Sequence, residues 1–174
     1  MTETRAALIL VDLQQWILGM HPWEPTPAAA LVGACARLRA GFTEVVLVRH
    51  LHAGGSDGGP EAPAGRLHER VAPGPGDLVV VKHGLDAFEG TDLAARLAAR
   101  GISDVVIAGL STAHAVAATA RTALASGYRV TLVSDATTTV SAAEQDRVLG
   151  QLAAAGAAVR TAEEILSGRL VTGS

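Results

Sequence analysis

The sequence predicts an α/β fold in which helices cover both faces of a parallel sheet. Apolar runs rich in β-branched residues recur along the chain, near 6–12, 44–49, 78–82, 104–109, 128–133 and 157–160. Stretches rich in Ala and Leu separate these runs, near 27–40, 91–100, 113–126, 141–155 and 161–167. Continuous apolar strands that alternate with helices are typical of a three-layer α/β/α sandwich, Rossmann-like, with about six strands here.

The composition indicates one globular domain, residues 1–174. Hydrophobic residues make up 49% of the chain but aromatic residues only 3%, so we expect a core of Ala, Val and Leu. The net charge of −3 and the absence of a basic block argue against a nucleic-acid partner. No apolar run approaches the roughly 18 residues of a membrane span. The first residues lack a signal-peptide layout and Cys35 is the single cysteine, which predicts a cytoplasmic protein.

One region departs from the alternating pattern. Residues 53–77 are rich in Gly and Pro and poor in apolar residues. We interpret them as a long loop between the second and third strands, next to the active site, because long loops without secondary structure are usually functional.

Two charged residues stand where apolar strands end. Asp12 ends the first run and Lys82 ends the third. Burial beside a strand end would raise the pKa of Asp12, and a nearby ammonium would lower it. The pattern favours an acid/base carboxylate with a cationic partner. A helix N-cap at Asp12 and an exposed strand-end lysine are the alternatives.

The segment 109–116 reads as a strand end, a tight turn and a helix start. Such a turn lies at the carboxyl end of a parallel strand, where α/β folds place their chemistry. The helix N-terminus adds free N–H groups and a partial positive charge. The residue best placed to be a nucleophile is Ala115, which has no reactive atom.

This turn resembles that of the isochorismatase-like cysteine hydrolase superfamily, in which the pattern is roughly Gly-x-x-Thr-x-x-Cys-Val. Gly109, Thr112 and Val116 match it, and Ala115 stands in the place of the cysteine. The resemblance extends over almost the whole chain through four further segments similar to family motifs: Ile9–Gln14, Val79–Lys82, Phe88–Leu93 and Val133–Ala136.

The resemblance implies catalytic roles for Asp12 and Lys82. In the amidohydrolases of the superfamily, the aspartate takes the proton of the cysteine and the thiolate attacks an amide carbonyl. The oxyanion hole would consist of the backbone amides of Ser111 and Ala115, with a cis peptide between Leu110 and Ser111. The implied substrate is a small cyclic or planar amide or carbamoyl compound, and the implied assembly is a homodimer or a higher homo-oligomer.

Ala115 leaves several interpretations open. The chain could belong to the cysteine-free branch that hydrolyses a vinyl ether with an Asp12–Lys82 pair alone. It could carry an alanine in place of a cysteine, which the surrounding Thr112 and His114 favour. It could also be a metabolite-binding protein of the same fold without activity, or an oligomeric scaffold. Cys35 is no substitute nucleophile, because it lies on the apolar stripe of a predicted helix.

Other residues are candidates for the site. His50-x-His52 preserves the spacing of a histidine pair in the metal site of nicotinamidases, although a metal needs a third ligand, for which His68 and His83 are the candidates.

Asp135 is interpreted as a structural cap of the loop 136–140 rather than as a catalytic group. The candidates for substrate contact, with core or surface roles as alternatives, are Gln14, Trp16, Arg49, His50, Phe88 and His114. No other cofactor is expected.

Overall fold

The computed structural model describes residues 5–172 and the side chains of residues 5–168. Six parallel strands form one sheet in the order β3-β2-β1-β4-β5-β6. The strands are β1 (Arg5–Val11), β2 (Val45–His50), β3 (Leu78–Lys82), β4 (Ile102–Leu110), β5 (Arg129–Thr138) and β6 (Ala158–Arg160). The helices are α1 (Gln15–Leu18), α2 (Ala28–Ala40), α3 (Leu93–Ala99), α4 (Ala117–Ala125), α5 (Ala142–Ala154) and α6 (Ala162–Thr172).

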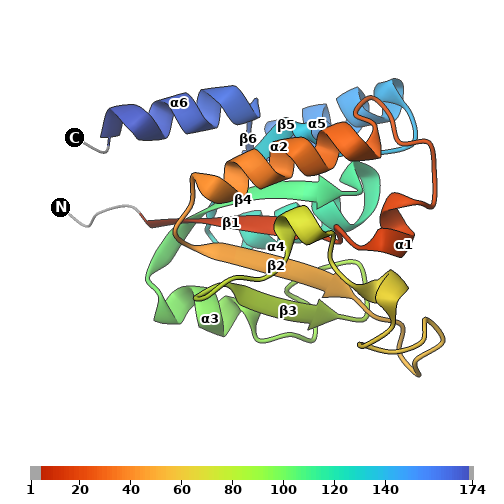
Figure 1. Ribbon diagram of the computed structural model, residues 1–174. Coiled ribbons are helices and arrows are strands. Elements are labelled where there is room, and N and C mark those ends of the chain that lie inside the picture. The colour runs from red at the N-terminus through yellow and green to blue at the C-terminus, as the bar shows by residue number, and fades with distance from the viewer. Residues whose placement is uncertain (1–4, 173–174) are drawn as a thin grey trace.

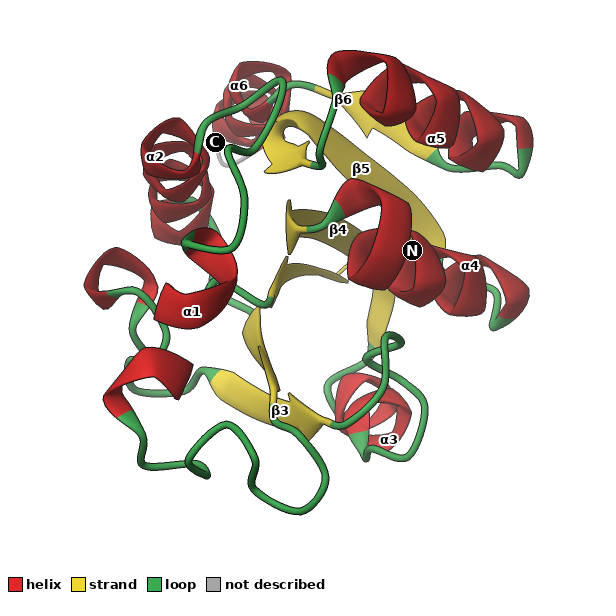
Figure 2. Cartoon of the chain, turned by 90° about the vertical axis from the view of Figure 1, so that its right-hand side faces the viewer, coloured by secondary structure: helices red, strands yellow, loops and turns green. Residues whose placement is uncertain are grey.

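The helices form two layers, one on each face of the sheet. Helices α1, α2 and α6 cover one face, and α3, α4 and α5 cover the other (Figures 1 and 2). This arrangement confirms the predicted three-layer α/β/α architecture. No helix of the described part of the chain is long and apolar enough to cross a membrane.

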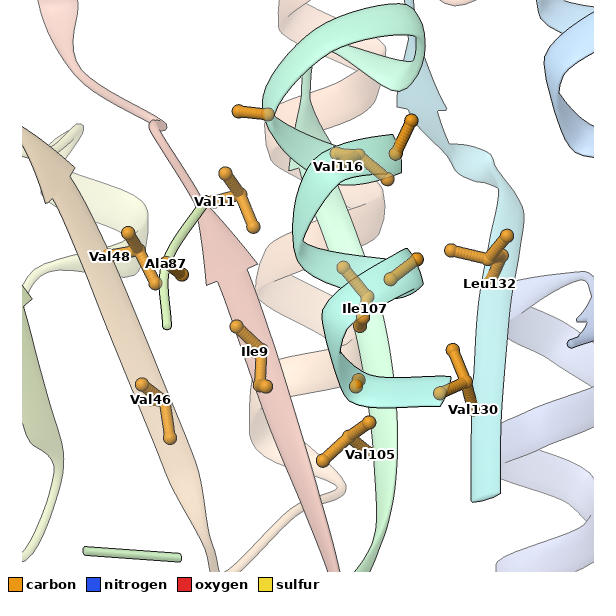
Figure 3. Packing of buried hydrophobic residues seen from close by; sticks show 14 of the residues in the cluster. Ile9, Val11, Val46, Val48, Ala87, Val105, Ile107, Val116, Val130 and Leu132 are labelled. Carbon is orange, nitrogen blue, oxygen red and sulfur yellow. The ribbon is translucent and has the colours of Figure 1, made fainter. Parts of the chain in front are cut away.

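The core follows from the alternation of side chains along the strands. Leu8 and Leu10 of β1 pack toward α2, whereas Ile9 and Val11 pack on the opposite face (Figure 3). Helix α4 presents small residues to that second face, so it can lie close to the sheet. The predicted core, mainly of Ala, Val and Leu with few aromatic residues, is confirmed, and Cys35 is fully buried within it.

The two central strands approach each other closely at Gly109. This residue pairs with Val11 and has a φ of 113°. A Cβ atom at position 109 would lie 2.2 Å from the carbonyl oxygen and 2.7 Å from the amide nitrogen of Val11. Only glycine therefore fits here, at the point where β4 runs into the turn.

The strand order creates a crevice at one edge of the sheet. The chain runs from β1 outward through β2 to β3, then crosses to β4 on the other side of β1 and continues outward to β6. Connections on the two sides diverge beyond the carboxyl ends of β1 and β4. This divergence is the usual ligand site of open α/β sheets.

Two details differ from the sequence prediction. Strand β5 continues to Thr138, beyond the predicted run 128–133, so Asp135 lies within the strand. Instead, the Asp135 carboxylate accepts a hydrogen bond of 2.7 Å from the Ala162 N–H at the start of α6. Asp135 is thus structural, as expected, but it holds a different segment from the loop 136–140. In addition, Thr112–Val116 forms a π-helical turn before α4.

The long segment between β2 and β3 contains two short 3₁₀ turns, Pro63–Gly65 and Glu69–Val71. It packs beside β1 and α1 through backbone hydrogen bonds from Gln15 to Arg66 and from His68 to Leu13. The residues of 53–77 do not line the cavity described below. The expectation that this loop borders the site is therefore wrong. The loop instead holds the segment that follows β1, through the hydrogen bonds to Leu13 and Gln15.

Candidate active site

A cavity of about 310 Å³ opens beyond the carboxyl ends of the strands at the crevice between β1 and β4. Its polar lining residues are Asp12, His21, His50, Lys82, Ser111 and His114. Its apolar lining residues are Trp16, Ile17, Met20, Trp23, Leu85, Leu110, Ala115 and Val140. Segments far apart in the sequence meet here because each follows a strand of the same parallel sheet.

A buried ion pair lies in this cavity. Lys82 Nζ donates to Asp12 Oδ2 at 2.9 Å and to the Gly84 carbonyl at 3.0 Å. The Lys82 side chain is 0% exposed and that of Asp12 is 8% exposed. Asp12 has a φ of 55°, in the left-handed region that aspartate tolerates better than most residues. This contact confirms the prediction that Lys82 pairs with Asp12.

Burial raises the pKa of Asp12 from 3.8 to about 6, although the charge and the hydrogen bond of Lys82 oppose the rise. Its second oxygen, Oδ1, is buried and has no hydrogen-bond partner among the described residues. A ligand in the cavity would satisfy this atom. Near neutral pH the carboxyl group can therefore hold or give a proton.

Replacing Lys82 by Met is expected to raise the pKa of Asp12 above about 6, because the ammonium and its hydrogen bond lower it. Methionine keeps most of the buried volume and removes the charge. The NMR titration of the Asp12 carboxyl carbon measures the shift. Arg96→Met is the matched control, since Arg96 pairs with Asp92 on the surface. A pKa of Asp12 that stays at or below its wild-type value in Lys82→Met would refute the role of the ammonium.

The turn after β4 brings its residues to the opposite wall of the cavity. The peptide bond between Leu110 and Ser111 is cis, as the resemblance implies. Ala115 is 3% exposed and lines the cavity, so the position that would carry a nucleophile holds only a methyl group. Ser111 Oγ lies 2.9 Å from His114 Nδ1. The oxyanion-hole role of the Ser111 and Ala115 amides stays a prediction.

Three predicted contact residues lie outside the cavity. Gln14 is fully buried and holds the end of β2: its Nε2 donates to the carbonyls of His50 and Gly65, and its Oε1 accepts from the His50 N–H. Arg49 lines a second cavity and donates to the Pro60 and Gly65 carbonyls. Phe88 packs against Tyr128. None of these side chains lines the cavity that holds Asp12.

The predicted histidine pair does not gain a third metal ligand. The rings of His50 and His52 lie 5.2 Å apart, and both contact Trp16. Burial and the Lys82 ammonium lower the pKa of His50. His83 Nδ1 lies 2.7 Å from the Leu51 carbonyl and His68 Nδ1 caps a 3₁₀ turn. Within the described residues, no group of three or more His, Cys, Asp or Glu could hold a metal ion.

Sequence reasoning missed much of the apolar lining. Trp23 is buried and its Nε1 donates to the Leu18 carbonyl. Met20, Leu85 and Val140 are exposed around the mouth of the cavity. The chain has only two tryptophans, and this rarity could have marked Trp23 as a candidate for the cavity wall. The other three lie in irregular segments, where no periodicity indicates which way a side chain points.

Comparisons with known proteins show the family and the fold of this chain. Residues 6–164 match the profile of the isochorismatase domain. A streptothricin hydrolase of Streptomyces noursei is 40% identical over 135 residues, which cover 75% of this chain and 48% of that protein. A second streptothricin hydrolase from Streptomyces noursei is 38% identical, so the chain spans about half the length of these two relatives.

Solved structures show the same fold. An isochorismatase family protein from Burkholderia thailandensis has a TM-score of 0.83 at 31% identity, over 93% of this chain and 94% of that one. N-carbamoylsarcosine amidase from Thermoplasma acidophilum has a TM-score of 0.74 at 28% identity, over 91% and 97% of the two chains. The match to the isochorismatase domain over residues 6–164 shows that the chain belongs to the isochorismatase family, and the six-stranded parallel sheet agrees with it.

Proposed function

We propose that this protein hydrolyses a small amide or carbamoyl compound and that Asp12 is its general acid. One observation carries the proposal: a carboxyl group with a pKa of about 6 is paired with a buried lysine in a cavity, and one of its oxygens has no partner among the described residues. A carboxyl group tuned toward neutrality is suited to proton transfer.

Each polar group has a distinct task in this proposal. An attacking oxygen bonds to the carbonyl carbon and the C–N bond breaks with its electron pair on nitrogen. Protonated Asp12 gives its proton to that nitrogen, and Lys82 stabilises the carboxylate that remains. The backbone N–H groups of Ser111 and Ala115 receive the negative charge that develops on the carbonyl oxygen. Preorganised donors of this kind contribute roughly 3–4 kcal/mol of transition-state stabilisation in other hydrolases.

The lining of the cavity indicates the shape of the substrate. Trp16, Ile17, Trp23 and Leu110 form apolar walls, which favour a flat or cyclic molecule. Two similar proteins have names that agree with the proposed chemistry: one is a streptothricin hydrolase and the other an N-carbamoylsarcosine amidase. We also retain, as parts of the proposal, a homodimer or higher homo-oligomer and a cytoplasmic location.

A panel of cyclic amides, carbamoyl amines and N-carbamoyl amino acids tests this function. Release of ammonia or amine, measured with the purified chain, supports it. Saturable binding of a panel member without any product would instead identify a metabolite-binding protein.

A second candidate is the hydrolysis of a vinyl ether, which the absence of a nucleophilic atom on Ala115 favours. In that reaction Asp12 protonates the enol carbon and water adds to the oxocarbenium ion, so no covalent intermediate is needed. In D₂O, deuterium would enter the product at that carbon. Amide hydrolysis leaves no such label, so mass spectrometry of the products separates the two candidates.

Ala115→Cys is expected to increase amide hydrolysis by about tenfold or more, because a thiol at this position can attack a bound carbonyl. The increase should be accompanied by an acyl-enzyme that intact-mass spectrometry detects after a rapid quench. Ala113→Cys is the matched control, since Ala113 lies in the same turn but does not line the cavity. An Ala115→Cys variant that is no faster than Ala113→Cys would exclude the cysteine-type lineage of this site.

A further inference from the structure

A hydroxyl group and an imidazole lie in contact on the cavity wall, next to the empty nucleophile position. Ser111 Oγ is 2.9 Å from His114 Nδ1, and both residues line the cavity. Ser111 is half-buried and His114 is exposed, so a ligand in the cavity can reach both. We propose that Ser111 is the nucleophile of this hydrolase and His114 its general base, an inference that rests on the proposed amide or carbamoyl hydrolysis.

The serine hydroxyl is not engaged in holding the turn. Ser111 occupies the N-cap position of the turn Thr112–Val116, where a serine oxygen ordinarily accepts a backbone N–H bond. Here its side chain makes no capping hydrogen bond and is directed at the His114 ring instead. Its carbonyl, not its hydroxyl, accepts the N–H groups of His114 and Val116. The hydroxyl is thus available for chemistry.

The separation of 2.9 Å permits the hydrogen bond that activation requires, in which the Ser111 hydroxyl donates and His114 Nδ1 accepts. When the His114 proton is on Nε2, Nδ1 is an acceptor and the Ser111 hydroxyl donates to it. A serine oxygen bonded in this way to an imidazole is the nucleophile–base arrangement found in acyl-transfer enzymes. Ser111 follows β4, whereas Asp12 follows β1, so the nucleophile and the acid flank the crevice between these strands.

The proposed reaction has two steps, formation of an acyl ester on Ser111 and its hydrolysis. In the first, Ser111 Oγ bonds to the carbonyl carbon and its proton passes to His114 Nδ1. The C–N bond breaks with its electron pair on nitrogen, and Asp12 protonates that nitrogen. In the second, water attacks the acyl ester and gives a proton to the Asp12 carboxylate. The ester C–O bond breaks, and Ser111 Oγ recovers its proton from His114.

An alkyl fluorophosphonate tests the dyad without knowledge of the substrate. Attack by Ser111 Oγ forms the O–P bond, expels fluoride from phosphorus and transfers the proton to His114. Peptide mapping of the wild-type protein should place the phosphonate on Ser111. Ser111→Ala should remain unlabelled, and His114→Ala should be labelled about 100-fold more slowly or worse, the usual contribution of a general base.

Two further variants control for non-specific labelling and for the accessibility of position 111. Ser103→Ala is the matched control, because Ser103 bonds to Asp104 away from the cavity, and it should be labelled at the wild-type rate. In Ser111→Cys, iodoacetamide should alkylate residue 111 and spare Cys35, which is fully buried with a pKa raised to about 12. Thermal melts that match the wild type show that each variant is folded.

The outcomes separate this inference from the proposed function. Failure to label Ser111 in the wild type, equal labelling rates in His114→Ala and the wild type, or full hydrolytic activity in Ser111→Ala would each overturn the dyad. The last result would leave the proposed amide hydrolysis standing. Labelling of Ser111 that depends on His114, in a protein that hydrolyses no amide or carbamoyl compound, would support the dyad and reject the proposed substrate class.

Discussion

Asp12→Asn should reduce turnover by about 10³-fold or more, because an amide cannot deliver the proton that the proposed reaction requires. Asparagine has nearly the same shape as aspartate, and it also tolerates the left-handed backbone of position 12, where φ is 55°. Lys82 keeps its hydrogen bond to the Gly84 carbonyl in the variant. The loss should therefore be chemical rather than structural. Steady-state kcat, measured beside a thermal melt, tests it.

Asp92→Asn is the matched control for this substitution. Asp92 pairs with Arg96 on the surface, and its side chain is 58% exposed. Its replacement should leave kcat unchanged. Retention of more than about one tenth of the wild-type activity in Asp12→Asn would reject Asp12 as the acid.

The same carboxyl group sets a pH dependence. The wild-type rate should fall as the pH rises through about 6, because the proton-bearing form of Asp12 is lost there. The folded state also binds this proton more tightly than the unfolded state, in which the pKa is near 3.8. The contribution of Asp12 to the free energy of unfolding is therefore fully present below 3.8 and is lost as the pH rises through about 6. Asp12→Asn should lack this component.

Gly109→Ala is expected to cost more than about 3 kcal/mol of unfolding free energy or to prevent folding. The new methyl group would meet backbone atoms of Val11, 2.2 and 2.7 Å away, which cannot move without parting β1 from β4. The positive φ of 113° adds strain that an L-residue rarely tolerates. Urea denaturation monitored by circular dichroism measures the loss.

Gly101→Ala separates the clash from the strain. Gly101 also has a positive φ, 65°, but a Cβ atom there would have no neighbour within 4 Å. Its replacement should cost only about 1–2 kcal/mol, the price of a left-handed residue. Equal losses in the two variants would show that the close approach of β1 and β4 contributes nothing.

The strands and the ion pair were predictable because they obey strong local rules. Strands β1 and β3 are nearly continuous apolar runs, and Asp12 and Lys82 stand at the ends of these runs, where parallel strands end at one edge of the sheet. The prediction that Arg49 contacts the substrate failed, because the alternation of side chains was not applied to it. Side chains alternate along a strand, so once His50 faces the cavity its neighbour must point elsewhere.

The remainder depended on tertiary structure. The apolar run of β5 ends at Val133, yet the strand continues through polar Thr137, whose hydroxyl bonds to the buried amide of Gln145. No local pattern indicates that distant partner. The hydrogen bond between Ser111 and His114 likewise depends on the π-helical turn, which the sequence did not reveal.

The placement of the aromatic residues gives the protein its own optical probe. Trp16 and Trp23 are the two tryptophans of the chain, and both line the cavity. Light absorbed at the red edge of the protein spectrum therefore excites indoles beside the substrate. A bound molecule that displaces water or quenches an indole will change the emission, so affinities can be titrated on the unmodified chain.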